Sequence, residues 1–192
     1  MRQRAMIAMA LACDPAVVIG DEPTTALDVM VQAQILELLE RLRRELGLSL
    51  ILITHDLSVI AETCDRVLIM YAGKVAEEGE VDVIFRHPRH PYTQKLLGAF
   101  PNIHADRRTL DVIGGSPPDL RDPPPGCRFH PRCPAAMAVC REVVPPEVTF
   151  ADGVRIACHL YPPGSDGSQP VASSPPLAAS GSLVASRGGA GA

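Results

Sequence analysis

The sequence predicts an α/β fold in which a parallel sheet is continued by an antiparallel edge. Two short aliphatic runs, 16–19 and 48–53, lie on either side of a long stretch with helical periodicity, an order typical of a buried parallel sheet. A hairpin pattern follows the second run, and from about residue 101 the chain becomes rich in proline and cysteine. We therefore expect an α/β domain with a Pro/Cys-rich carboxy-terminal extension.

The first residues predict a helix that leads into the first strand. Residues 1–12 are rich in Ala, Met and Leu, and Pro15 ends this pattern. A charged start before an apolar run is also typical of a signal peptide, but no small-residue cleavage site follows, which favours a helix of the folded domain. The aliphatic run 16–19 then predicts a strand buried on both faces.

The second helix carries signals at both of its ends. Asp28 is a suitable N-cap residue, because its carboxylate can accept a hydrogen bond from a free N–H of the first turn. Gly47 stands where a left-handed residue ends a helix. Between them, one apolar stripe predicts the buried face. It comprises Ile35, Leu38, Leu39, Leu42 and Leu46.

The next elements are shorter. A helix is expected over 57–63, and the segments 66–71 and 74–77 predict a hairpin joined by a tight turn. Two short helices, 81–86 and 92–99, are expected to close the domain.

We divide the chain into three parts. Residues 1–100 form the α/β domain, and residues 101–162 form an extension that contains a cysteine cluster. Residues 163–192 consist mainly of Gly, Ser, Ala and Pro. They are expected to be disordered, because they cannot bury enough apolar surface to offset the entropy lost on ordering.

Composition limits the classes of function. The net charge of −4 argues against a general nucleic-acid binder, which needs clustered Lys and Arg. No apolar run approaches the roughly 20 residues that span a bilayer. Four of the six cysteines gather in the second half of the chain, which in a cytosolic protein indicates metal binding before disulfides. The other two, Cys13 and Cys64, are expected to be buried small side chains.

Two adjacent carboxylates, Asp21 and Glu22, end the first strand. Side chains at the carboxyl end of a parallel strand face the crevice where α/β sheets bind ligands. The first carboxylate can hold Mg²⁺ on phosphates, and the second can polarise a water that attacks phosphorus. The alternative is that both are ordinary surface acids at a strand-to-turn junction.

The surrounding residues resemble the ATPase subunits of ABC transporters. Residues 23–28 (PTTALD) resemble the D-loop of that family, and residues 54–56 (THD) resemble its switch-histidine loop. Residues 2–4 and the helix after them resemble the segment that follows the Leu-Ser-Gly-Gly signature. The resemblance covers residues 1 to about 85 and implies the carboxy-terminal part of a P-loop NTPase domain.

The resemblance also implies roles for four residues. Asp21 is the expected Walker B metal carboxylate, and Glu22 is the expected catalytic base or water-orienting residue. Asp28 is expected in the D-loop that communicates with a partner subunit, and His55 is expected to contact the γ-phosphate. ATP and Mg²⁺ are the implied ligands of a complete subunit.

Three motifs of the same family do not occur in the sequence. There is no Gly-x-x-x-x-Gly-Lys-[Ser/Thr] phosphate loop, no Q-loop and no signature. Met1 stands where the residue after the signature would be. We interpret the chain as a fragment from a truncated gene, a split gene or a misassigned start codon, with a genuinely short protein as the alternative. The chain alone is expected to be inactive as an ATPase.

The cysteine cluster has the spacing C-x5-C-x6-C-x17-C. Four thiolates can hold Zn²⁺ or an iron–sulfur cluster. The spacing is looser than in common zinc knuckles and does not choose the metal, and free structural thiols are the alternative. The candidate ligands are Cys127, Cys133, Cys140 and Cys158.

The second half of the chain resembles the tail of oligopeptide and dipeptide importer ATPases. The matching segments are 87–93 (HPRHPYT), 126–134 (GCRFHPRCP) and 157–159 (ACH). This resemblance covers about residues 85–162. It implies a [4Fe-4S] cluster bound by the four cysteines, with Zn²⁺ as the alternative cofactor.

Together the two resemblances imply an ATP-binding, ATP-hydrolysing subunit that energises peptide import at the cytoplasmic face of the cell membrane. The implied partners are a second ABC ATPase subunit, two transmembrane permeases and, indirectly, an extracytoplasmic peptide-binding protein, with no nucleic acid. A soluble ABC-type ATPase and a non-enzymatic metal-binding remnant are the alternatives. The sequence does not distinguish oligopeptide, dipeptide or nickel as the transported substrate.

Overall fold

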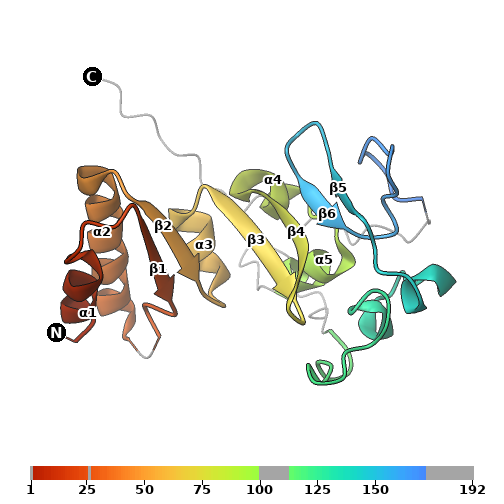
Figure 1. The fold of residues 1–192 in the computed structure, drawn as a ribbon, viewed down its shortest axis with the longest axis horizontal. Helices are drawn as coiled ribbons and strands as arrows, with labels where there is room; N and C mark the ends of the chain where they lie inside the picture. Colours follow the sequence, from red (N-terminus) through yellow and green to blue (C-terminus); the bar gives the residue numbers. More distant parts are fainter. Residues whose placement is uncertain (1, 26, 100–112, 172–192) are drawn as a thin grey trace, which may run out of the picture. The chain divides into compact units, whose positions relative to one another are not determined.

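The computed structural model describes residues 2–25, 27–99 and 113–171. These residues form two compact units, the first ending at Cys64 and the second beginning at Asp65. The α/β class predicted from the sequence is confirmed (Figure 1). The expectation that the parallel sheet continues into an antiparallel edge is wrong, because the described parallel and antiparallel strands form two separate sheets. None of the described helices is long and apolar enough to cross a membrane.

The first unit contains a two-stranded parallel sheet with helices before, between and after its strands. The strands pair in register from Val17 opposite Ser49 to Asp21 opposite Ile53. The elements in chain order are α1 (Arg2–Leu11), β1 (Val17–Asp21), α2 (Val29–Leu46), β2 (Ser49–Ile53) and α3 (Leu57–Thr63).

The ends of α2 lie where the sequence predicts them. The carboxylate of Asp28 accepts a hydrogen bond from the N–H of Val31 at 2.9 Å, as an N-cap does. Gly47 ends the helix with a left-handed φ of 64°, which glycine adopts without steric cost. Ile35 and Leu39 from the predicted stripe are buried.

The two strands differ from the expectation of burial on both faces. Val17 and Ile19 on β1 and Ile51 and Ile53 on β2 are half-exposed or more. The opposite face of the sheet lies against α1 and α2, where Val18, Leu48 and Leu50 help to line a cavity. The aliphatic runs are therefore covered on one face by the described residues.

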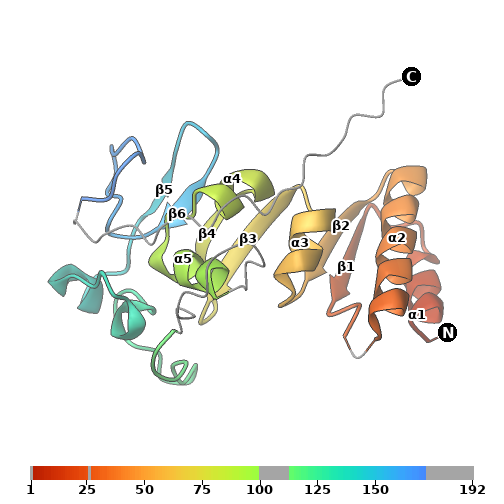
Figure 2. The ribbon, with the colours of Figure 1, turned by 180° about the vertical axis from the view of Figure 1, so that it is seen from behind.

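The second unit is built on a four-stranded antiparallel sheet. The strand order is β3-β4-β6-β5, so that a strand of the carboxy-terminal extension pairs with the predicted hairpin. α4 and α5 lie against this hairpin in both views (Figures 1 and 2). The elements are β3 (Arg66–Tyr71), β4 (Lys74–Glu80), α4 (Val81–Arg86), α5 (Pro91–Gly98), β5 (Glu147–Thr149) and β6 (Arg155–Ala157).

The extension provides much of the core of this unit. Val154, Ile156 and Phe129 of the extension are buried, as is Ile84 of α4. The chain also remains packed beyond residue 162, where disorder was expected to begin. The carbonyl of Gly167 accepts a hydrogen bond from Arg89 Nε at 3.1 Å. The rest of the predicted disordered tail, 172–192, lies outside the described residues.

Replacing Ile156 by Ala is expected to destabilise the second unit by about 2–5 kcal/mol, because the change leaves a cavity in its core. Ile156 is 1% exposed. All three tyrosines (Tyr71, Tyr92 and Tyr161) lie in this unit and the chain has no tryptophan, so tyrosine fluorescence during urea unfolding reports on this unit. The control Val144→Ala alters a 66% exposed side chain and should change the free energy of unfolding by less than about 0.5 kcal/mol. Equal midpoints for both variants would contradict the assigned core.

Candidate functional site

The parallel pairing of β1 and β2 brings Glu22 and His55 together. Glu22 directly follows Asp21, the last residue of β1, and His55 lies two residues beyond Ile53, the last residue of β2. Because parallel strands end at the same edge of a sheet, both side chains emerge there. Nδ1 of His55 lies 2.8 Å from Oε1 of Glu22. The structure therefore places the two predicted catalytic residues in direct contact.

Glu22 is fixed by its backbone as well as its side chain. Its φ of 49° lies in the left-handed region, which is uncommon for a residue with a Cβ. Its N–H donates to the carbonyl of Ile53 at 2.8 Å, and its carbonyl accepts from the N–H of Thr25 at 3.2 Å. The Thr25 hydroxyl donates to Oε2 of Glu22 at 2.5 Å. Both carboxylate oxygens of Glu22 are thus engaged.

These contacts set the charges of the pair. The hydrogen bonds from His55 and Thr25 lower the pKa of Glu22, while the contact with Glu22 raises the pKa of His55. The pair is therefore fully charged between the lowered pKa of Glu22 and the raised pKa of His55. Glu22 becomes neutral as the pH falls through its lowered pKa, and His55 becomes neutral as the pH rises through its raised pKa.

The other two predicted nucleotide-site residues are not part of this contact. Asp21 is an exposed residue at the end of β1. The carboxylate of Asp28 caps α2 through the N–H of Val31. Asp28 therefore has a structural role that fixes where α2 begins, beside any role toward a partner.

Thr25 and Asp56 had no individual role predicted from the sequence, and both make side-chain contacts here. Asp56 caps α3 by accepting from the N–H of Ser58 at 3.0 Å, and its other oxygen accepts from Gln32 of α2 at 3.3 Å. An Asp directly before a helical segment is an N-cap signal, so this role was readable from the sequence. The Thr25 contact depends on the backbone conformation of Glu22 and was not.

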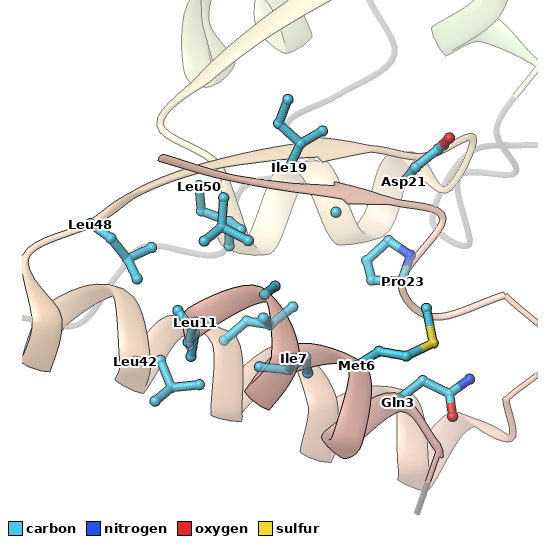
Figure 3. Close-up of a pocket in the computed structure, with 14 residues that line it drawn as sticks. Gln3, Met6, Ile7, Leu11, Ile19, Asp21, Pro23, Leu42, Leu48 and Leu50 are labelled. Carbon is cyan, nitrogen blue, oxygen red and sulfur yellow. The ribbon is translucent and has the colours of Figure 1, made fainter. Parts of the chain in front are cut away.

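An apolar cavity of about 190 Å³ lies between the helices α1 and α2 and the strands (Figure 3). Asp21 and Pro23 are near one end of it, and most of its wall is aliphatic. Such a surface offers few groups that bind phosphate, so we do not assign the nucleotide to this cavity. Its aliphatic lining includes Ile7, Leu11, Leu42, Leu48 and Leu50.

The four clustered cysteines gather in the second unit. The N–H of Cys127 donates to the carbonyl of Cys140 at 2.9 Å. Burial raises the pKa of Cys133 to about 11 and that of Cys158 to about 12, and for Cys158 the other three cysteines add to the rise. All four thiols therefore lie within electrostatic reach of one another. Among the described residues, however, no group of three or more Cys, His, Asp or Glu is arranged to hold a single metal ion.

Gly126 allows the backbone just before Cys127 to pass close to the backbone of Cys140. The segment from Cys127 to Cys140 is called the cysteine segment below. Its φ of 65° is left-handed, and a Cβ there would lie 2.5 Å from the carbonyl oxygen of Cys140. Any other residue would push the two cysteine-bearing turns apart, so glycine is required at this position. Two 3₁₀ segments lie in this region: His130–Arg132, between Cys127 and Cys133, and Ala138–Arg141, which contains Cys140.

The cysteine segment is anchored to the β3–β4 hairpin by Phe129. This side chain is 2% exposed, and its ring lies 5.0 Å from that of Tyr71 and 5.4 Å from that of Tyr92. The guanidinium of Arg128 donates to the carbonyl of Ala72 in the hairpin turn. Arg132 donates to the Tyr71 hydroxyl at 3.2 Å. The cysteines thus belong to a packed unit rather than to a loose tail.

A buried carboxylate orders the segment 87–93. Glu77 of β4 accepts hydrogen bonds from the backbone N–H of Arg89 at 2.8 Å and of His90 at 3.0 Å. Its burial raises its pKa. Nδ1 of His90 accepts from the N–H of Tyr92, and burial lowers the pKa of His90 to about 4. Glu77 was not identified from the sequence, since nothing in the local pattern distinguishes it from the glutamate that follows it.

The two cysteines outside the cluster correct an expectation, and one histidine contacts the backbone of a clustered cysteine. Cys13 is exposed and Cys64 is half-buried, so the expectation that both are buried is wrong. His130, within the cysteine segment, contacts the carbonyl of Cys127 at 2.9 Å.

Comparisons with known proteins find similarity in both units. Residues 76–140 match the family model of the oligopeptide/dipeptide transporter C-terminal region. The dipeptide transport ATP-binding protein DppD of Bacillus subtilis is 53% identical over 83% of this chain and 48% of its own length. The oligopeptide transport ATP-binding protein OppD of Escherichia coli is 52% identical over 82% of this chain and 47% of its own length. This chain thus spans about half the length of these relatives.

A solved structure is similar over a shorter stretch. It is an ATP-binding cassette in a post-hydrolysis state bound to ADP and Pi, 35% identical over 42% of this chain and 34% of its own chain, with a TM-score of 0.38.

The contact between Glu22 and His55 predicts a measurable titration. We expect the His55 imidazole to titrate above 6.5, because the Glu22 carboxylate favours its charged form. In Glu22→Gln the charge is lost, and the pKa of His55 should fall toward 6.5. NMR titration of the imidazole signals measures this, with His55→Gln identifying the signal among the six histidines. An unchanged His55 titration in Glu22→Gln would show that the contact does not form in solution.

Proposed function

The matched residues of this chain belong to the family of ATP-binding subunits of oligopeptide and dipeptide transporters, and on this premise we propose that they supply the hydrolytic residues of an ATPase that energises peptide import. The observation that carries the proposal is the 2.8 Å contact between Glu22 and His55 at the shared edge of two parallel strands. An ionised carboxylate beside an imidazole is suited to orienting a water for attack on a phosphoryl group.

Each residue of the site has a proposed part in that reaction. Glu22 orients the attacking water and accepts its proton. His55 contacts the γ-phosphate. To do so, it gives up its hydrogen bond to Glu22 and forms one to the nucleotide. Because its side chain is 82% exposed, little packing opposes that movement.

The residues present also fit a magnesium ion. Asp21 is an exposed carboxylate at a strand end, and carboxylate oxygens suit Mg²⁺, which keeps several of its waters. When bound, Mg²⁺ would neutralise charge on the phosphates. Asp28 holds the start of α2 and so sets the loop of residues 23–28, which we propose faces a second ATPase subunit.

The proposed setting follows from the transport function. The partners are a second ATP-binding subunit, two transmembrane permeases and, through them, an extracytoplasmic peptide-binding protein. We place the chain at the cytoplasmic face of the membrane as a peripheral subunit. We also retain the sequence-based division into an ATPase part (1–100), a cysteine-bearing extension (101–162) and a low-complexity tail (163–192).

We further propose that the four cysteines bind a [4Fe-4S] cluster. In such a cluster each thiolate binds a different iron, so the ligands lie farther apart than around one ion. The four thiols influence one another electrostatically, but no three of them are arranged to hold one ion, which favours a cluster over a single Zn²⁺. Burial raises the pKa values of Cys127, Cys133 and Cys158 and so disfavours their free thiolates, a cost that a bound metal centre would offset. The cluster would act as a crosslink within the second unit.

Glu22→Gln should slow ATP hydrolysis by about 10²–10⁴-fold while ATP binding is kept, because the amide cannot accept the proton of the attacking water. His55→Ala should also slow it. The assay uses a hybrid in which this chain replaces the matched half of the Bacillus subtilis relative, with ATP binding measured separately. Glu37→Gln, which alters an exposed carboxylate on α2, is the control and should leave turnover unchanged. Near-normal turnover in both site variants would refute the assignment.

Anaerobically purified chain should contain iron and sulfide in equal amounts and absorb visible light through thiolate-to-iron charge transfer. Cys133→Ser should lose the cluster and lower the urea midpoint of the tyrosine transition, because the crosslink is lost. Cys13→Ser, in the first unit and exposed, should change neither. Stoichiometric zinc without iron would replace the proposed cofactor, and four freely alkylated thiols in the native protein would eliminate the site.

A further inference from the structure

Thr25 makes a contact that the start of α2 does not require. Its hydroxyl donates to Oε2 of Glu22 at 2.5 Å. The helix that follows is capped by Asp28, through the N–H of Val31. The Thr25 side chain therefore does not serve as the cap, and its hydroxyl is directed at the carboxylate instead.

The two bonds to the Glu22 carboxylate restrict it in complementary ways. His55 holds Oε1 and Thr25 holds Oε2, so rotation of the carboxylate about its last side-chain bond breaks both. An ionised carboxylate can only accept hydrogen bonds, so the Thr25 hydroxyl must be the donor. Hydrogen bonds to charged acceptors are short and roughly twice as strong as neutral ones.

Packing does not supply this restraint. The Thr25 residue is exposed and Glu22 is only partly covered, while the His55 side chain is 82% exposed. A glutamate on an exposed turn would otherwise sample several rotamers. Thr25 is stiff about its first side-chain bond because it is β-branched, which makes its hydroxyl a well-defined donor.

We propose that Thr25 is a positioning residue for Glu22, whose hydroxyl fixes one carboxylate oxygen so that the other faces His55. The catalytic consequence rests on the function proposed above: Thr25 acts through Glu22 and touches neither the water nor the nucleotide.

The test measures the His55 titration by NMR in the purified chain, without nucleotide. Thr25→Val keeps the shape and removes the donor, so the carboxylate turns away for part of the time. The pKa of His55 should then fall by at least half of the change that Glu22→Gln causes. Thr25→Ser restores the donor and should return the wild-type value. Asp56, which also raises the pKa of His55, is the same in all variants.

Circular dichroism and urea unfolding show whether each variant is folded, and Thr25→Ala provides a second variant without the hydroxyl. A His55 pKa at or above the wild-type value in both Thr25→Val and Thr25→Ala would overturn the proposal, as would a Thr25→Ser variant that resembles Thr25→Val. Since no nucleotide is present, failure of the hybrid to hydrolyse ATP leaves this result unaffected. The two proposals can therefore fail separately.

Discussion

The candidate site depends on the parallel pairing of β1 with β2. The register places Asp21 opposite Ile53, and the carbonyl of Ile53 then accepts the N–H of Glu22. That bond helps to hold Glu22 in its left-handed conformation, and the same strand carries the chain on to His55. A shift of one residue in this register would turn the strand side chains to the opposite face of the sheet and separate the two functional side chains.

The second unit depends on a different constraint, the joining of distant segments around one sheet. β6 pairs with β4, and Phe129 packs against the aromatic rings of the hairpin and α5. Glu77, fully buried, holds the backbone at Arg89 and His90. A carboxylate without such partners would be costly to bury. The burial of Glu77 on β4 and the backbone conformation of the segment 87–93 therefore depend on each other. The cysteines gather because this framework positions the turns that carry them.

Much of the local structure was predictable, because local structure is decided by neighbouring residues. Asp28 and Gly47 mark the ends of α2 as their chemistry requires, and the hairpin turn lies at Ala72 and Gly73, both with positive φ. The sequence placed Glu22 and His55 at the ends of two strands, whereas their direct contact was decided by the parallel pairing of those strands. The half-exposed face of β1 and β2 was not predictable, since a run of aliphatic residues does not indicate which segments pack against each of its faces.

By itself the sequence determined the order of the elements, the caps of α2 and the segments that resemble ABC-type ATPases, all of which involve residues a few positions apart. Only the tertiary structure decided that Thr25 holds the second oxygen of Glu22, that Glu77 is buried and that the extension completes the sheet of the second unit. The physical reason is that these features depend on backbone conformation and on pairing between distant segments. The residues next to a threonine, a glutamate or a short strand do not indicate which distant group it will contact.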